Sequence, residues 1–193
     1  RLYKNFPTSP DAPAALYMAG FLRTGLGDHK GAAQNFMTYV EKLPAQPDSE
    51  AVYWLAGQQW QLVGDKEALS FYRRYLQRFP DSSPDHVMEA YHFIAKYYER
   101  TGDKRAAEQA WKDITTNYAR LAAKGTLGPK ARNIGAEAAF RDMQVAYNNF
   151  IKVSYPKKDE DLIKYLLEDK PKEFAAITQM ELALITTYQD FEY

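Results

Sequence analysis

Small and apolar side chains recur three or four residues apart over two neighbouring stretches near the middle of the chain. This spacing places them on one face of an α-helix, which predicts helices over residues 50–63 and 66–79. Between these stretches we expect Gly64 to adopt the left-handed conformation that ends a helix, and Asp65 to cap the next helix. Proline has no amide hydrogen, so the second helix ends before Pro80. The positions that define this pattern are Tyr53, Ala56, Gly57, Trp60, Gly64, Asp65, Ala68, Tyr72 and Pro80.

Two positions of this pattern carry small side chains for a steric reason. Gly57 and Ala68 are predicted to lie where two antiparallel helices cross closely, because a bulky side chain there would push the helices apart. We expect Tyr53, Trp60 and Tyr72 to fill the space on either side of the crossing. The two stretches therefore predict one helical hairpin.

The same pattern occurs upstream and downstream, with Gly20 and Ala95 at the position of Gly57. The Gly-Asp turns are 64 − 27 = 37 and 102 − 64 = 38 residues apart. The upstream copy consists of Leu16, Ala19, Gly20, Gly27, Asp28, Ala32, Phe36 and Pro44, and the downstream copy of Tyr91, Ile94, Ala95, Tyr98, Gly102, Asp103, Ala107 and Trp111. The sequence thus predicts an all-α solenoid with three regular repeats: residues 12–47, 48–83 and 84–123. Their other helices are expected over residues 12–26, 30–43, 84–101 and 104–122.

The remaining segments are less regular. Residues 1–11 are interpreted as the end of a preceding repeat, and residues 189–193 as the start of a next one, so we expect the array to continue beyond both ends. Residues 129–188 predict an enlarged, irregular fourth hairpin, and the whole chain (1–193) is treated as one solenoid. Within that hairpin we expect a long helix over residues 129–153, a charged break at 154–161, a short helix over 162–168 and, beyond Pro171, a long helix to about residue 188. No stretch alternates with period two, so no sheet is expected.

The three regular repeats resemble tetratricopeptide (TPR) repeat proteins in the order and spacing of their small, aromatic and proline positions. Two further motifs are similar to bacterial cell-envelope and gliding-motility TPR proteins. They consist of Phe6, Pro7, Thr8, Ser9, Pro10 and Asp11 leading into Ala15, Leu16 and Tyr17, and of Ala136, Glu137, Ala138, Ala139, Phe140 and Arg141. The resemblance implies a TPR-like α-solenoid, non-enzymatic protein binding, and a place in the periplasm or cell envelope. A cytoplasmic location stays open.

Stacked hairpins of this kind place the first helix of each repeat along a concave groove. Counted from the small crossing residue, the positions three before, one after and four after should face that groove. These positions hold Tyr17, Phe21, Thr24, Trp54, Gln58, Gln61, His92, Lys96 and Glu99. Such a surface suits an extended or helical peptide, with rings as anchors and amides bonding its backbone. The alternative is that the rings of Tyr17, Phe21 and Trp54 pack between neighbouring hairpins.

Composition narrows the partners and the chemistry. The chain has 25 basic and 25 acidic side chains, which argues against a nucleic-acid partner, and it has no cysteine for disulfides or thiolate chemistry. No apolar run approaches the ~20 residues that span a bilayer. His86, Glu89 and His92 follow each other at i, i+3 spacing, but a di-metal site of this type needs the Glu-x-x-His motif twice. We therefore expect an ordinary polar helix face there, with no metal, no cofactor and no catalytic residues.

The sequence favours a non-enzymatic scaffold that binds a partner peptide or domain in its groove, within a larger envelope or motility assembly. Two alternatives stay open. One is the helical accessory portion of a peptidoglycan-cleaving enzyme, and the other is a solenoid that associates with itself. The oligomeric state is not indicated by the sequence.

Overall fold

The computed structural model describes residues 2–6, 8–152 and 155–188. Every regular element in these ranges is helical, so the predicted all-α fold of helical hairpins is confirmed. The chain divides into two compact units, Arg1–Ala110 and Trp111–Tyr193 (unit 1 and unit 2 below), each with its own packing. The predicted next repeat at residues 189–193 lies outside the described residues.

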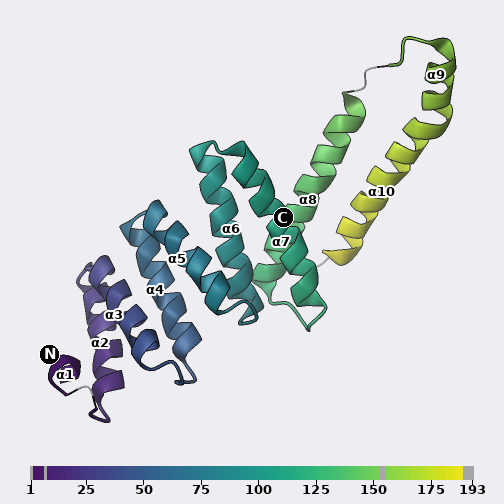
Figure 1. Ribbon diagram of the computed structural model, residues 1–193. Coiled ribbons are helices and arrows are strands. Elements are labelled where there is room, and N and C mark those ends of the chain that lie inside the picture. Colours follow the sequence, from purple (N-terminus) through teal and green to yellow (C-terminus); the bar gives the residue numbers. More distant parts are fainter. Residues whose placement is uncertain (1, 7, 153–154, 189–193) are drawn as a thin grey trace. The chain divides into compact units, whose positions relative to one another are not determined.

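Unit 1 is a succession of helices in which, from α1 to α6, each packs on the next (Figure 1). Its helices are α1 (Leu2–Asn5), α2 (Ala12–Gly25), α3 (His29–Lys42), α4 (Ser49–Val63), α5 (Asp65–Arg78), α6 (Pro84–Thr101) and the beginning of α7 (Lys104–Ala122). From α2 onward, the predicted ends of these helices are confirmed to within a residue.

The close crossing of paired helices is the feature that the sequence predicted most directly. A Cβ atom built on Gly57 would lie 2.7 Å from Cε1 of Phe71, and one on Gly20 would lie 2.5 Å from Cε1 of Phe36. Carbon atoms do not approach this closely without a shift of one of them, so a side chain at either position would have to displace the facing ring. Ala95, at the same position of the third repeat, is fully buried. The predicted register of the first two repeats is therefore confirmed, and the burial of Ala95 agrees with it in the third.

Two of the three Gly-Asp turns have the expected geometry. Gly27 has φ 74° and Gly102 has φ 77°, both in the left-handed region that favours glycine. The Asp28 carboxylate accepts a hydrogen bond from the amide of Gly31 at 3.0 Å, and the carboxylate of Asp103 accepts one from Ala106 at 3.0 Å. Each aspartate thus caps the helix that follows it.

The turn of the second repeat differs, and both predictions made for it are wrong. Gly64 has φ 166°, which is extended backbone, and Asp65 is the first residue of α5 without capping it. Its carboxylate instead pairs with Arg100 on α6 at 3.0 Å. The reason is chain length: Gly64 precedes Ala68 by four residues, whereas Gly27 precedes Ala32 by five. A single residue is left to connect the helices, and an extended conformation spans the gap.

The core of unit 1 is aromatic. Its second repeat alone buries the rings of Tyr53, Trp54, Phe71, Tyr72 and Tyr75. The centroids of Tyr53 and Phe71 lie 4.6 Å apart across the crossing of α4 and α5. Such ring pairs add ~0.5–1.5 kcal/mol beyond the area that they bury, so the second repeat is held mainly by aromatic packing.

Unit 2 contains the remainder of α7, then α8 (Pro129–Ile151), α9 (Asp159–Lys164), a π-helical turn η1 (Tyr165–Asp169) and α10 (Lys170–Thr187). Helices α8 and α10 lie antiparallel and side by side (Figure 1). Gly135 of α8 faces the ring of Tyr118 on α7, so a glycine permits close approach in this unit as well.

The predicted break between a short and a long helix in this hairpin is wrong. The helix begins at Asp159 and continues through η1 into α10 without interruption. The amide of Lys170 donates to the carbonyl of Tyr165, five residues earlier, which is the wider spacing of a π-turn. This wider turn gives room for the ring of Pro171, which would clash with a carbonyl in a regular α-helix.

Replacing Gly57 with leucine should lower the free energy of unfolding by ~1–3 kcal/mol, because the new side chain must displace the ring of Phe71. Denaturant unfolding followed by circular dichroism measures this change. Gly64→Ala is the control, since its nearest contact is the movable carboxylate of Glu67 and its backbone is extended. An unchanged midpoint for the leucine variant would mean that the crossing does not set the register.

Candidate partner-binding surface

The nine residues predicted to line a groove lie on α2, α4 and α6 of unit 1, and their exposure differs widely. Phe21 is 60% exposed, and Gln58 and Gln61 are also on the surface. The other members, apart from Trp54, are half-buried: Tyr17, Thr24, His92, Lys96 and Glu99. The first repeat therefore offers a ring to a partner, while the third offers mixed charge.

Several of these side chains are already engaged. The ring of Tyr17 lies 5.9 Å from that of Phe36, and the hydroxyl of Thr24 donates to the carbonyl of Gly20 at 3.2 Å. The side-chain amide of Gln61 donates to the Tyr72 hydroxyl at 2.7 Å. On α6 the ammonium group of Lys96 lies 3.6 Å from the carboxylate of Glu99.

Gln58 differs from these neighbours. It makes no side-chain hydrogen bond to any residue that the structure describes, so its amide can both donate to and accept from a partner. Phe21 and Gln58 are thus the two groove positions with the most capacity left for binding.

Trp54 lies in the packing between repeats and is not a groove anchor. Only 6% of its surface is exposed. Its ring stacks on the imidazole of His86 at 4.2 Å between centroids and meets the edge of Tyr75 at 5.1 Å. Trp54 occupies the position that Tyr17 holds one repeat earlier, and the next repeat places His86 of α6 over its indole. Of the two roles left open for this ring, the structure supports packing.

A polar network surrounds this stack and joins α4, α5 and α6. One carboxylate oxygen of Glu50 accepts from the Tyr75 hydroxyl at 2.5 Å and lies 2.9 Å from Nδ1 of His86. The same hydroxyl lies 2.8 Å from that of Ser82. Burial, and then the hydrogen bond to the Glu50 carboxylate, raise the pKa of Tyr75, so this phenol stays protonated in the folded chain. The network holds the second and third repeats together.

His86 was considered as a metal ligand together with Glu89 and His92. Its Nδ1 faces Glu50, on a different helix. Within the described ranges, no group of three or more histidine or carboxylate side chains is arranged to hold a metal ion.

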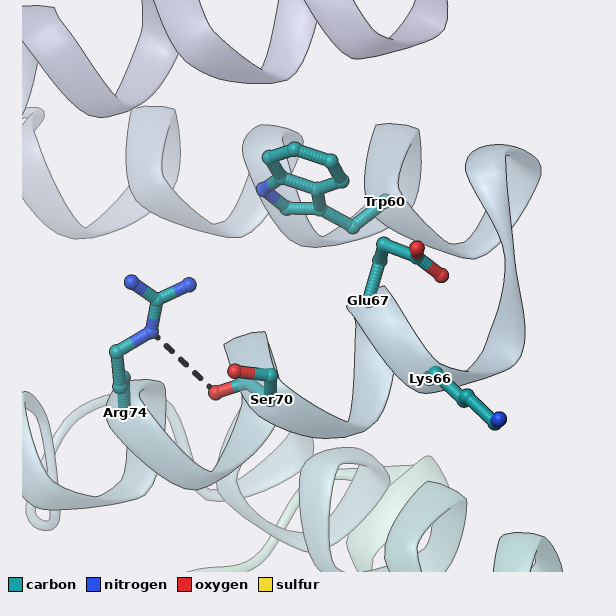
Figure 2. A pocket seen from close by; sticks show the side chains of 5 residues that line it. All are labelled: Trp60, Lys66, Glu67, Ser70 and Arg74. Carbon is teal, nitrogen blue, oxygen red and sulfur yellow. Dashed lines mark hydrogen bonds between the residues drawn. The ribbon is translucent and has the colours of Figure 1, made fainter.

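Sequence reasoning did not identify a pocket of about 280 Å³ on the α4–α5 hairpin (Figure 2). Its lining comes from Trp60, Lys66, Glu67, Ser70 and Arg74. The indole of Trp60 donates to the sulfur of Met37 at 3.3 Å, and Nε of Arg74 donates to the carbonyl of Ser70 at 3.3 Å. Figure 2 shows the Lys66 side chain extending away from the other four. The sequence feature that indicates this pocket is the i, i+3, i+7 spacing of Glu67, Ser70 and Arg74, which places the three side chains on one face of α5.

Further exposed apolar side chains of unit 1 were also missed. They are Met18 and Leu22 on α2, Leu26 directly after its end, and Leu62 and Val63 at the end of α4. Exposed apolar side chains that form a patch are typical of protein-contacting surfaces. The sequence signal was the lack of a charged side chain at these positions.

Hairpins that repeat one register of small and aromatic residues define a helical-repeat protein. Residues 50–82, which contain α5 and all of α4 except its first residue, match the family model described as tetratricopeptide repeat, so the chain carries a tetratricopeptide repeat at this hairpin. Repeats of this family generally mediate protein–protein interaction. No curated protein matches the chain. In the part of the chain that the structure describes, no helix has the length and apolar character needed to cross a membrane.

Trp54→Ala should lower the free energy of unfolding by ~3–5 kcal/mol, because it opens a cavity among buried rings. Phe21→Ala should change it by no more than ~0.5 kcal/mol, since the ring is mostly in water. Denaturant unfolding of the two single variants measures the contrast. Equal effects for both would contradict the buried position of Trp54.

Proposed function

We propose that this chain is a non-enzymatic protein-interaction scaffold, and that unit 1 binds a peptide segment of its partner along α2 and α4. The observation that carries the proposal is Phe21, a large ring that is 60% exposed on a well-packed helix. A protein gains nothing in stability from holding such a ring in water, whereas aromatic anchors dominate the affinity of many interfaces.

The two central contact residues are Phe21 and Gln58. Each follows the small crossing residue of its repeat by one position, so both come from the same face of their helices. The phenyl ring would take an apolar side chain of the peptide. The amide of Gln58 would pair with a peptide N–H or C=O group, which otherwise loses its hydrogen bond to water.

The surrounding contacts support a preformed surface. Arg78 of α5 donates to the carbonyl of Val40 on α3 at 3.2 Å, and Arg100 of α6 pairs with Asp65 of α5. These links restrain neighbouring helices before a partner arrives, which reduces the entropy lost on binding.

We place this scaffold in a larger assembly of the bacterial cell envelope or motility apparatus. The support is the similarity of residues 6–17 and 136–141 to TPR proteins of those systems. This placement belongs to the proposal, and cell fractionation with an antibody against the chain tests it.

A library of displayed random peptides, selected on the immobilised chain, tests the binding surface. Selected peptides should lose at least about tenfold in affinity for Phe21→Ala and for Gln58→Ala, because each variant removes a central contact. Fluorescence polarisation with the isolated peptides gives the dissociation constants.

Matched controls are available in unit 1. Phe6 is 61% exposed, close to the value for Phe21, and Gln77 is an exposed glutamine on α5. Phe6→Ala and Gln77→Ala should leave the affinities unchanged. Peptides that bind all four variants equally would place the binding surface elsewhere and overturn the proposal.

A further inference from the structure

The α8–α10 hairpin of unit 2 leaves large apolar side chains in water. None of the 18 residues of α10 is buried, although its sequence from Phe174 to Thr187 contains one charged residue, Glu181. A helix that is apolar on most sides normally lies inside a protein. Its own neighbour α8 covers only one side, so α10 has the composition of a helix with more partners.

Five of the exposed large apolar side chains of α8 and α10 gather on one side of the hairpin, while Val145 and Leu182 lie away from it. On α8, Phe140, Tyr147 and Ile151 follow each other at i, i+7 and i+11, which is a single stripe along the helix. On α10, Phe174 and Ile185 are separated by the same 11 residues. The rings of Phe150 and Phe174 lie 6.0 Å apart, so the antiparallel arrangement brings Ile185 to the level of Phe140.

Helix geometry places both stripes on the same side of the plane that contains the two helix axes. On each helix, the stripe lies roughly a quarter turn around the helix axis from the side that faces the other helix. Because the two helices run in opposite directions, these quarter turns lead to the same side of the hairpin. We call this side, defined by Phe140, Tyr147, Ile151, Phe174 and Ile185, the apolar face.

The other side of the hairpin carries different residues. Asp142, Asn149, Ala176 and Ala183 lie there, and the carboxylate of Asp142 accepts from the hydroxyl of Thr115 on α7 at 3.2 Å. Helix α7 therefore packs toward that side, and within unit 2 no described element covers the apolar face. Its five large side chains are between 45% and 59% exposed.

Charge argues against a lipid surface as the occupant. Helices that lie on anionic membranes flank their apolar side with lysine and arginine. From Phe174 to Thr187 the charged residue is the acidic Glu181, with no lysine or arginine in that stretch. The face is thus suited to another apolar protein surface.

The size of the face argues for a second copy of the chain. Half-exposed side chains of this kind present on the order of 100 Å² each, so five give ~500 Å² per copy and ~1,000 Å² for a pair, which reaches the threshold of a specific interface. The stripes on α8 and α10 run side by side and have equal length, so the same two stripes of a second copy can cover both. One extended peptide would cover only one of them. We propose that two copies associate through their apolar faces about a two-fold axis, so that α8 and α10 of both form a four-helix bundle.

Sedimentation of the whole chain over a range of concentrations tests the pairing. The chain should pass from one to two copies as its concentration rises. Phe174→Glu with Ile185→Glu should raise the dissociation constant of the pair at least about 100-fold, because two carboxylates would lose their water without a partner. Ala176→Glu with Ala183→Glu places the same charges on the other side of α10 and should leave the constant unchanged.

Circular dichroism shows whether each variant keeps its helices. A chain that stays monomeric at every concentration would overturn the proposal, as would equal effects of the two double variants.

A second measurement does not depend on charged variants. The chain has no cysteine, so a single introduced thiol can form a disulfide only with a second copy. Under mild oxidation, Tyr147→Cys or Phe174→Cys should give a covalent dimer, and Ala183→Cys should not. A dimer formed only by Ala183→Cys would assign the contact to the other side of the hairpin. Peptide binding by unit 1 can fail or succeed independently of this result.

Discussion

The close approach of paired helices is the constraint on which the structure of unit 1 depends. At the crossing of α4 and α5, a single added carbon on Gly57 would lie 2.7 Å from the ring of Phe71. The helices can be this close only with glycine there, and the ring then fills the space that a side chain would have taken. Because the contact fixes the rotation of α4 about its axis, it also fixes which of its residues point to the core and which to water.

Neighbouring repeats use the same register for different purposes. The position three before the crossing residue holds Tyr17 in the first repeat and Trp54 in the second. Trp54 is buried because α6 brings His86 against its indole, whereas Tyr17 remains half-exposed. One position after the crossing residue, the first repeat exposes the ring of Phe21. The register therefore supplies equivalent positions, and the sequence of each repeat decides whether a position stabilises the stack or remains available to a partner.

The elements of the fold were largely predictable, because spacing in the sequence maps directly onto helix faces and turns. The conformation of Gly64 was not predictable from the recurring Gly-Asp pair, because the pair is the same in all three repeats while the distance from Gly64 to Ala68 is one residue shorter. Helix continuity through Pro171 depends on a π-turn, which leaves no pattern in apolar spacing. The burial of Trp54 needed the position of the following repeat. Pockets and exposed surfaces are formed by several helices together. For this reason the pocket and the exposed apolar side chains were not predicted, and Trp54 was placed in the groove although it is buried.

A double-mutant cycle between Gly57→Ala and Phe71→Leu tests the central constraint most directly. Unfolding free energies of the two single variants and the double variant give the coupling between the positions. If the ring sets the cost of a side chain at position 57, the alanine should cost at least ~1 kcal/mol less when Phe71 is already leucine. Equal costs in both backgrounds would contradict the account, because the glycine would then be required by something other than the approach of these two helices.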